Sequence, residues 1–231
     1  LFFSTINTIP VLDRDEARYA QSSRQMIETS DYFNIKFQED YRSKKPVGIY
    51  WLQTALVQLI SNTKIDSLHR NIIIKDNIWK YRLTSSLAGI LSILIIYFFA
   101  KNIYGRKIAF YSALILACSL LFTVEAHIAK TDSVLLTLSI LVMVLLSGYY
   151  SGKYEKKIDY RFFLLWIGIG FSILIKGPVL PFIVIITLLS LTLVNRDYDW
   201  LKKTYPIFGL LVIILINAPW LFFMSDAQMN S

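Results

Sequence analysis

Six long apolar runs, which follow one another from residue 83 to residue 224, constrain the fold of this chain most strongly. They lie at Leu83–Ala100, Ile108–Val124, Ser133–Tyr150, Phe162–Ile175, Val179–Val194 and Ile207–Met224. Most approach the ~20 residues with which an α-helix crosses a hydrocarbon core of ~30 Å. The runs are apolar on all sides, whereas a helix of a water-soluble bundle has one polar face. The sequence therefore predicts an all-α, polytopic membrane helix bundle.

Basic residues in the short connections between the runs predict the orientation of the bundle. Three alternate connections contain clusters of them: Lys101, Arg106 and Lys107; Lys153, Lys156, Lys157 and Arg161; Arg196, Lys202 and Lys203. The intervening connections hold only Lys130 and Lys176. Because cytoplasmic loops carry the excess of Lys and Arg, these clusters face the cytoplasm, and everything before Tyr81 faces outside. The formal net charge of +8 belongs largely to loops, which argues against a nucleic-acid partner.

The extracytoplasmic first loop, residues 11–80, contains two candidates for amphipathic surface helices. Asp13 with Glu16 three residues later is typical of a capping box, and it predicts a helix that continues to about Glu28. One stripe of this helix consists of Tyr19, Ala20, Ser23, Met26 and Ile27. The second candidate, residues 46–60, is short for a span and is interpreted as interfacial.

The ends of the chain complete the expected domain organisation. Residues 1–10 are interpreted as the outer end of a truncated first membrane span. The six-span membrane bundle occupies residues 81–224, and residues 225–231 begin a further outer loop.

Ionisable residues at the membrane edge are the candidates for chemistry, because a charge costs roughly 2.5 to 3.5 kcal/mol at the centre of a membrane helix. The candidates are Asp15, Glu16, Asp132, Lys44, Lys45 and Lys176. Each has a plain structural alternative. The early acids suit a first helical turn, Asp132 suits an N-cap, the lysine pair suits lipid headgroups, and Lys176 suits a turn anchor.

Short motifs along nearly the whole chain resemble those of GT-C-fold glycosyltransferases of the aminoarabinose-transferase and protein-mannosyltransferase type. In order they are Asp13-Arg14-Asp15-Glu16-Ala17-Arg18-Tyr19-Ala20, Tyr41 with Lys45-Pro46 and Tyr50-Trp51, Tyr104-Gly105-Arg106, Ala126 to Asp132, Lys176-Gly177, and Ala218-Pro219-Trp220. Each motif alone is weakly specific. Their common order, with matching hydropathy, indicates the N-terminal part of such an enzyme.

The resemblance implies an inverting transfer of a sugar from a polyprenyl-phosphate donor, with 4-amino-4-deoxy-L-arabinose or a hexose as the sugar. The implied acceptor is lipid A or another envelope glycolipid, with a protein hydroxyl as the alternative. The implied location is the bacterial inner membrane, with the active site on the periplasmic face.

The resemblance also implies roles for individual residues. Asp15 would be the general base, positioned by Glu16, and Asp132 would hold the acceptor or a cation of the site. The donor phosphate would be bound by cations that stabilise its developing charge. These cations are Lys45, Lys176 and Arg18.

Two departures from the family pattern concern cofactors. Lys44 stands where the family usually has Glu, and Val47 replaces the second proline. A divalent metal ion bound through that glutamate is therefore in doubt, and no metal ligand is assigned. Two other functions stay open: a transporter or flippase with Asp132 and Lys176 along its path, which would predict internal repeats, and a non-catalytic remnant that binds lipid.

Overall fold

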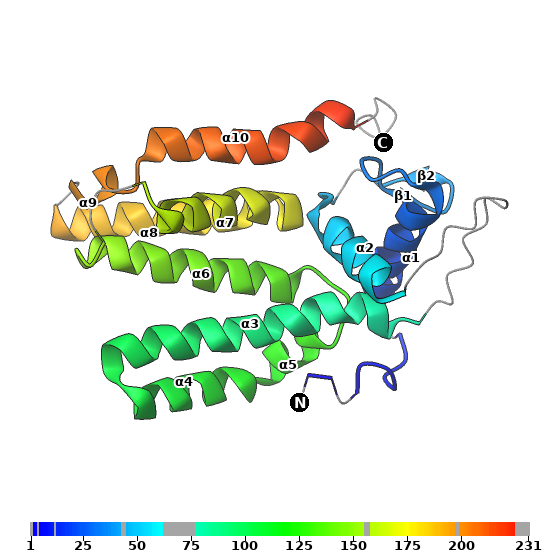
Figure 1. Cartoon of the computed structure of the whole chain (residues 1–231), viewed down its shortest axis with the longest axis horizontal. Helices are drawn as coiled ribbons and strands as arrows, with labels where there is room; N and C mark the ends of the chain where they lie inside the picture. The colour runs from blue at the N-terminus through cyan, green and yellow to red at the C-terminus, as the bar shows by residue number, and fades with distance from the viewer. Residues whose placement is uncertain are drawn as a thin grey trace.

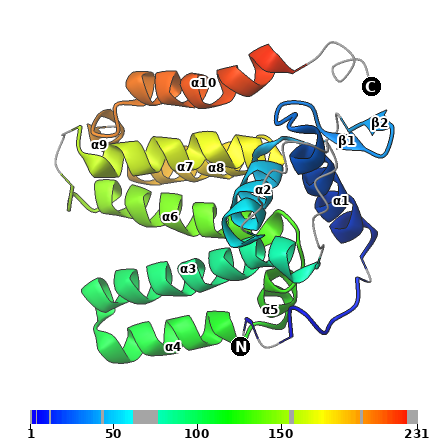
Figure 2. The same cartoon turned by 45° about the vertical axis from the view of Figure 1, so that its right-hand side comes forward.

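The computed structural model describes residues 2–3, 5–11, 13–42, 45–61, 77–154, 158–196 and 199–224. Its longer helices are α3 (Trp79–Tyr104), α4 (Arg106–Ala117), α6 (Asp132–Tyr150), α7 (Tyr160–Lys176), α8 (Val179–Asn195) and α10 (Pro206–Phe223). They run alongside one another as a bundle, as Figures 1 and 2 show. Two short helices, α5 (Leu120–Ala126) and α9 (Asp199–Lys202), lie in the connections. The predicted all-α membrane bundle is confirmed.

The apolar surface of the helices agrees with a multi-pass membrane protein. Among the described residues, α3, α6 and α10 are each long and apolar enough to cross a membrane, and α4 with α5 forms a fourth candidate. Large apolar side chains point outward on α10, where Ile207 is 76% exposed and Phe222 is 87% exposed. That exposure is favourable in lipid and unfavourable in water. The expected total of six spans stays a prediction.

The second apolar run, expected as one span, is broken into α4 and α5, which meet at an angle of 66°. The break falls at Cys118 and Ser119, and the backbone of Ser119 is extended. The Thr123 hydroxyl donates a hydrogen bond of 3.1 Å to the carbonyl of Ala117. This bond satisfies an acceptor that the end of α4 leaves without a helical partner.

Helices α1 (Arg14–Thr29) and α2 (Gly48–Ser61) lie together at one end of the bundle. Between them, β1 (Lys36–Phe37) and β2 (Asp40–Tyr41) form a small antiparallel hairpin with Lys36 opposite Tyr41. Both helices predicted for the first loop are therefore present, within two residues of their expected bounds. The predicted stripe of α1 is buried at all five positions. Its placement on the membrane surface stays a prediction.

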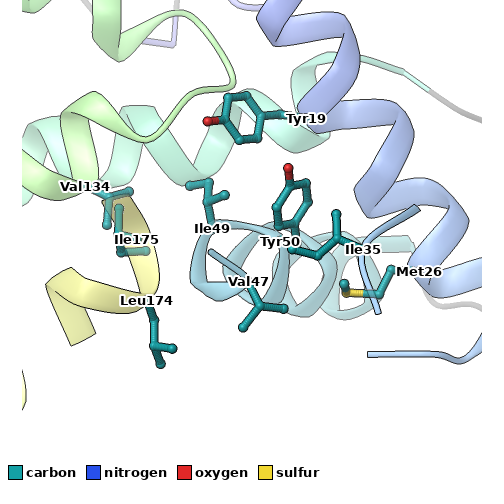
Figure 3. Packing of buried hydrophobic residues seen from close by; sticks show 9 residues of the cluster. All are labelled: Tyr19, Met26, Ile35, Val47, Ile49, Tyr50, Val134, Leu174 and Ile175. Carbon is teal, nitrogen blue, oxygen red and sulfur yellow. The ribbon is translucent and has the colours of Figure 1, made fainter. Parts of the chain in front are cut away.

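A buried apolar cluster joins α1 and α2 to the bundle, and Figure 3 shows its members. They are Tyr19, Met26, Ile35, Val47, Ile49, Tyr50, Val134, Leu174 and Ile175. Burying one large apolar side chain is worth about 1.5–3 kcal/mol, so this cluster fixes the first loop against the ends of α6 and α7. The approach is closest at Gly48, where an added Cβ would lie 2.7 Å from the carbonyl oxygen of Leu174.

The N-terminal segment takes the form of turns along its described part, with Phe2 and Ile6 buried. Its interpretation as the end of a further span stays a prediction. The predictions for Lys44 and for residues 225–231 lie outside the described residues.

Candidate active site

Asp13 fixes the start of α1 and ties it to the loop between α5 and α6. Its side chain accepts hydrogen bonds from the backbone amides of Asp15 (2.7 Å) and Glu16 (3.3 Å), which is the predicted N-cap. Its other carboxylate oxygen pairs with the Lys130 ammonium. The hydrogen bond from Lys130 lowers the pKa of Asp13, although burial acts in the opposite direction.

Glu16 is one of the most buried ionisable residues of the described chain, and it faces Arg82 rather than Asp15. Its carboxylate oxygens accept hydrogen bonds of 2.6 and 2.9 Å from the Arg82 guanidinium, and the Ala129 amide donates another at 2.9 Å. The expected capping box is therefore only half formed, because the Glu16 carboxylate reaches α3 and the α5–α6 loop. Glu16 can position Asp15 only through the backbone of α1.

Asp15 occupies a different side of α1, where its side chain is 46% exposed. The nearest cations are the guanidinium groups of Arg18, at 3.8 Å, and Arg42, at 4.0 Å. Both distances exceed that of a hydrogen bond. The carboxylate of Asp15 is thus accessible and only loosely paired.

Asp132 and Lys176 form an ion pair that joins the first turn of α6 to the last turn of α7. Both side chains are 37% exposed. The N-cap of α6 is Thr131, so Asp132 is the first helical residue, a position that favours a negative charge. Lys176 keeps further protons with which it can donate to an anion.

Tyr19 links these two acidic positions. The carboxylates of Asp15 and Asp132 both act electrostatically on its hydroxyl. Burial is the main reason that the pKa of Tyr19 is raised, while the Arg42 guanidinium opposes that rise. Tyr50 contacts it from α2, with ring centroids 5.5 Å apart (Figure 3).

Lys45 is half-buried and precedes α2 by three residues. Because Gly48 touches the backbone of Leu174, the segment that carries Lys45 is held at the end of α7, two residues from Lys176. The structure therefore gathers Asp15, Asp132, Lys45 and Lys176 at one end of the bundle. In the described part of the chain, no three His, Cys, Asp or Glu residues come together as ligands for a metal ion.

Sequence reasoning overlooked Arg42. Its guanidinium stacks on the ring of Tyr19, 4.8 Å from the ring centroid, and its side chain is only 13% exposed. The signal available in the sequence was its place between Tyr41 and Lys45, inside an element already singled out. Arg18, which was singled out, is more exposed at 37%.

Comparison with known proteins gives concordant matches. Residues 44–223 match the family described as dolichyl-phosphate-mannose-protein mannosyltransferase. The chain is 26% identical over 228 residues to an undecaprenyl phosphate-alpha-4-amino-4-deoxy-L-arabinose arabinosyl transferase of Aeromonas hydrophila, covering 95% of this chain and 39% of that protein. A second protein with that description, from Proteus mirabilis, is 25% identical and is matched over 99% of this chain and 40% of its own length.

The fold matches that of ArnT from Cupriavidus metallidurans. The apo crystal structure superposes with a TM-score of 0.83 at 23% identity, over 96% of this chain and 39% of that one. The structure bound to undecaprenyl phosphate gives a TM-score of 0.82, also at 23% identity, over 96% of this chain and 38% of that one. The chain thus spans about 40% of the length of the curated relatives that it matches.

Proposed function

Because the chain belongs to the dolichyl-phosphate-mannose-protein mannosyltransferase family, we propose that it acts as a membrane glycosyltransferase. The proposed reaction moves a sugar from a polyprenyl-phosphate donor to lipid A or another envelope glycolipid, with inversion at the anomeric carbon. The names of the Aeromonas and Proteus relatives support 4-amino-4-deoxy-L-arabinose as the sugar and undecaprenyl phosphate as its carrier. The family description supports the alternative, a mannosyl transfer to a protein hydroxyl.

The observation that carries this proposal is the exposure and loose pairing of the Asp15 carboxylate. It is half-exposed, and its nearest cations stand too far away to occupy its lone pairs. Asp132, which is paired with Lys176, acts electrostatically on the Tyr19 hydroxyl, as Asp15 does. An accessible carboxylate next to exposed cations fits a reaction in which one group accepts a proton while another stabilises a departing phosphate.

In the proposed mechanism, Asp15 removes the proton of the acceptor as the acceptor oxygen attacks the anomeric carbon. The bond between that carbon and the donor phosphate breaks, and the phosphate leaves with the electron pair. General base catalysis of this kind is worth roughly 10²- to 10⁴-fold in rate. Glu16 positions Asp15 by holding the first turn of α1.

The cations of the proposed site receive the phosphate. Lys45, Lys176 and Arg18 stabilise the negative charge that develops on it. Asp132 orients the Lys176 ammonium through their ion pair.

The proposed location is the periplasmic side of the bacterial inner membrane, with residues 11–80 outside and a six-span bundle at residues 81–224. Its support is the distribution of basic residues among the short connections between the apolar runs, because the three connections that contain clusters of Lys and Arg lie at the opposite end of the bundle from α1 and α2.

The test is transfer of radiolabelled sugar from polyprenyl phosphate in membranes that contain this chain. We expect Asp15→Asn to lower the rate by at least about 100-fold, whereas Asp40→Asn, which changes an exposed acid of β2, leaves it unchanged. Transfer by Asp15→Asn at the wild-type rate would reject the base assignment. No transfer by the wild-type chain would reject the activity for this chain.

A further inference from the structure

Arg42 is held in place by its backbone and by an aromatic ring. Its amide donates a hydrogen bond of 2.8 Å to the carbonyl of Ile35, which extends the β1–β2 hairpin by one residue. Its guanidinium lies on the face of Tyr19, and its side chain is nearly nine-tenths buried. A cation on an aromatic face gains some attraction, and both contacts orient the guanidinium toward the start of α1.

The buried guanidinium of Arg42 has one long contact with an anion and a buried donor without a hydrogen-bond partner. Its Nη1 atom is buried without a hydrogen-bond partner, and its Nη2 atom is 4.0 Å from the nearest carboxylate oxygen, on Asp15. Arg82 shows the contrasting case, because all three of its guanidinium nitrogens donate to Glu16 or to backbone carbonyls. Burying a charge without pairing is costly, so the uncommitted donors of Arg42 indicate a ligand.

The surroundings of Arg42 narrow the chemistry of that ligand. Tyr50 contributes a second buried donor, since its hydroxyl has no hydrogen-bond partner and it interacts electrostatically with Arg42. Burial raises the pKa of Tyr50, so this hydroxyl keeps its proton at neutral pH. A planar guanidinium beside a neutral hydroxyl donor suits a tetrahedral oxyanion that accepts two parallel N–H bonds.

We propose that Arg42 binds the phosphate group of a lipid substrate, beside the Asp15 carboxylate. The inference rests on the proposed function and adds to it a phosphate ligand that the sequence did not single out. The group that Arg42 binds is a phosphate ester. It belongs to one of two substrates, either the polyprenyl-phosphate donor or a phosphorylated glycolipid acceptor. When the phosphate binds, the Arg42 guanidinium gains the hydrogen bonds that it lacks. The phosphate then replaces the Asp15 carboxylate as the main electrostatic partner of Arg42.

The experiment measures lipid binding by the full 231-residue chain in nanodiscs of phosphatidylcholine. The first pair of probes is undecaprenyl phosphate and undecaprenol, and the second is bisphosphorylated lipid A and its dephosphorylated form. The variants are Arg42→Gln, which removes the charge, and Arg42→Lys, which keeps the charge but loses the planar guanidinium with its parallel N–H donors. The matched control is Arg24→Gln, which removes an arginine from α1 that pairs with Glu28.

We expect Arg42→Gln to weaken binding of a phosphorylated probe by roughly 10- to 100-fold, as for a lost hydrogen bond to a charged group. Arg42→Lys should give a smaller loss, and Arg24→Gln and the phosphate-free probes should show none. The phosphorylated lipid that loses affinity identifies the source of the phosphate. Equal binding of both phosphorylated lipids by Arg42→Gln, Arg42→Lys and Arg24→Gln would overturn this inference alone. A wild-type chain without preference for either phosphorylated lipid would overturn the proposed function as well.

Discussion

The Arg82–Glu16 pair offers the sharpest test of how the first loop is held on the bundle. The side chain of Arg82 is fully buried and that of Glu16 is 2% exposed. Besides Glu16, the guanidinium of Arg82 donates to the carbonyls of Ile6 (2.9 Å) and Ile9 (2.7 Å). One side chain of α3 therefore binds both α1 and the N-terminal segment. The perturbation is Arg82→Met, which removes the charge and keeps much of the volume.

The expected loss of stability follows from what Arg82→Met leaves behind. Glu16 would keep one hydrogen bond, from the Ala129 amide, and would otherwise be a buried carboxylate without a counter-ion. Removing one partner of a buried pair costs about 3–5 kcal/mol, which lowers the ratio of folded to unfolded protein roughly 150- to 5,000-fold. The double variant Arg82→Met/Glu16→Leu should regain most of this, because it leaves no buried charge unpaired.

The assay is reversible unfolding of the purified chain in mixed micelles with increasing dodecyl sulfate, followed by tryptophan fluorescence. The control is Arg24→Ala, which breaks the partly exposed pair with Glu28 and should cost at most about 1 kcal/mol. A loss below that value for Arg82→Met, or a double variant as unstable as the single one, would refute the reasoning.

Two further predictions concern the contacts on either side of the site. Gly48→Ala should lower the free energy of unfolding by about 1–3 kcal/mol, because its Cβ would meet the backbone of Leu174, whereas Ala55→Ser on the exposed side of α2 should not; equal stability of the two variants would contradict the close contact. Asp13→Asn keeps the cap and removes the charge opposite Lys130. The hydrogen bond from the Lys130 ammonium to the Asp13 carboxylate is the main cause that lowers the pKa of Asp13. The same bond raises the pKa of Lys130, although burial acts in the opposite direction. The wild-type advantage in unfolding free energy should therefore hold between roughly pH 4 and pH 10, and vanish below as Asp13 is protonated and above as Lys130 loses its proton. An advantage that is independent of pH would contradict the ion pair.

The elements of the fold were largely readable from the sequence, because their signals are local. Asp13 marked the start of α1, and the period of its buried stripe marked the face that packs inward. The break between α4 and α5 was not readable, since neither Pro nor Gly marks it. The hydrogen bond from the Thr123 hydroxyl to the Ala117 carbonyl replaces a backbone hydrogen bond that the break removes. Thr and Ala are both common within apolar runs, so neither residue indicates the break.

The sequence identified the charged residues of the site as a group, but it did not show which of them are buried or which partners they have. Asp15 and Glu16 are neighbours in the sequence, yet one is half-exposed and the other is buried against Arg82. Arg18 and Arg42 are equally basic, yet only Arg42 is buried with an unused donor. Partners of ionisable groups come from distant segments, so no local pattern predicts which charge is satisfied.

The sequence by itself determined that this chain is a multi-pass helical membrane protein, because hydropathy and helix length act within each segment. It also determined which residues carry charge outside the apolar runs. The tertiary structure alone decided which of those charges neutralise one another. Packing of α1 against α3 and the α5–α6 loop buries Glu16 on Arg82 and leaves Asp15 accessible, since a buried charge must find its partner in space rather than along the chain.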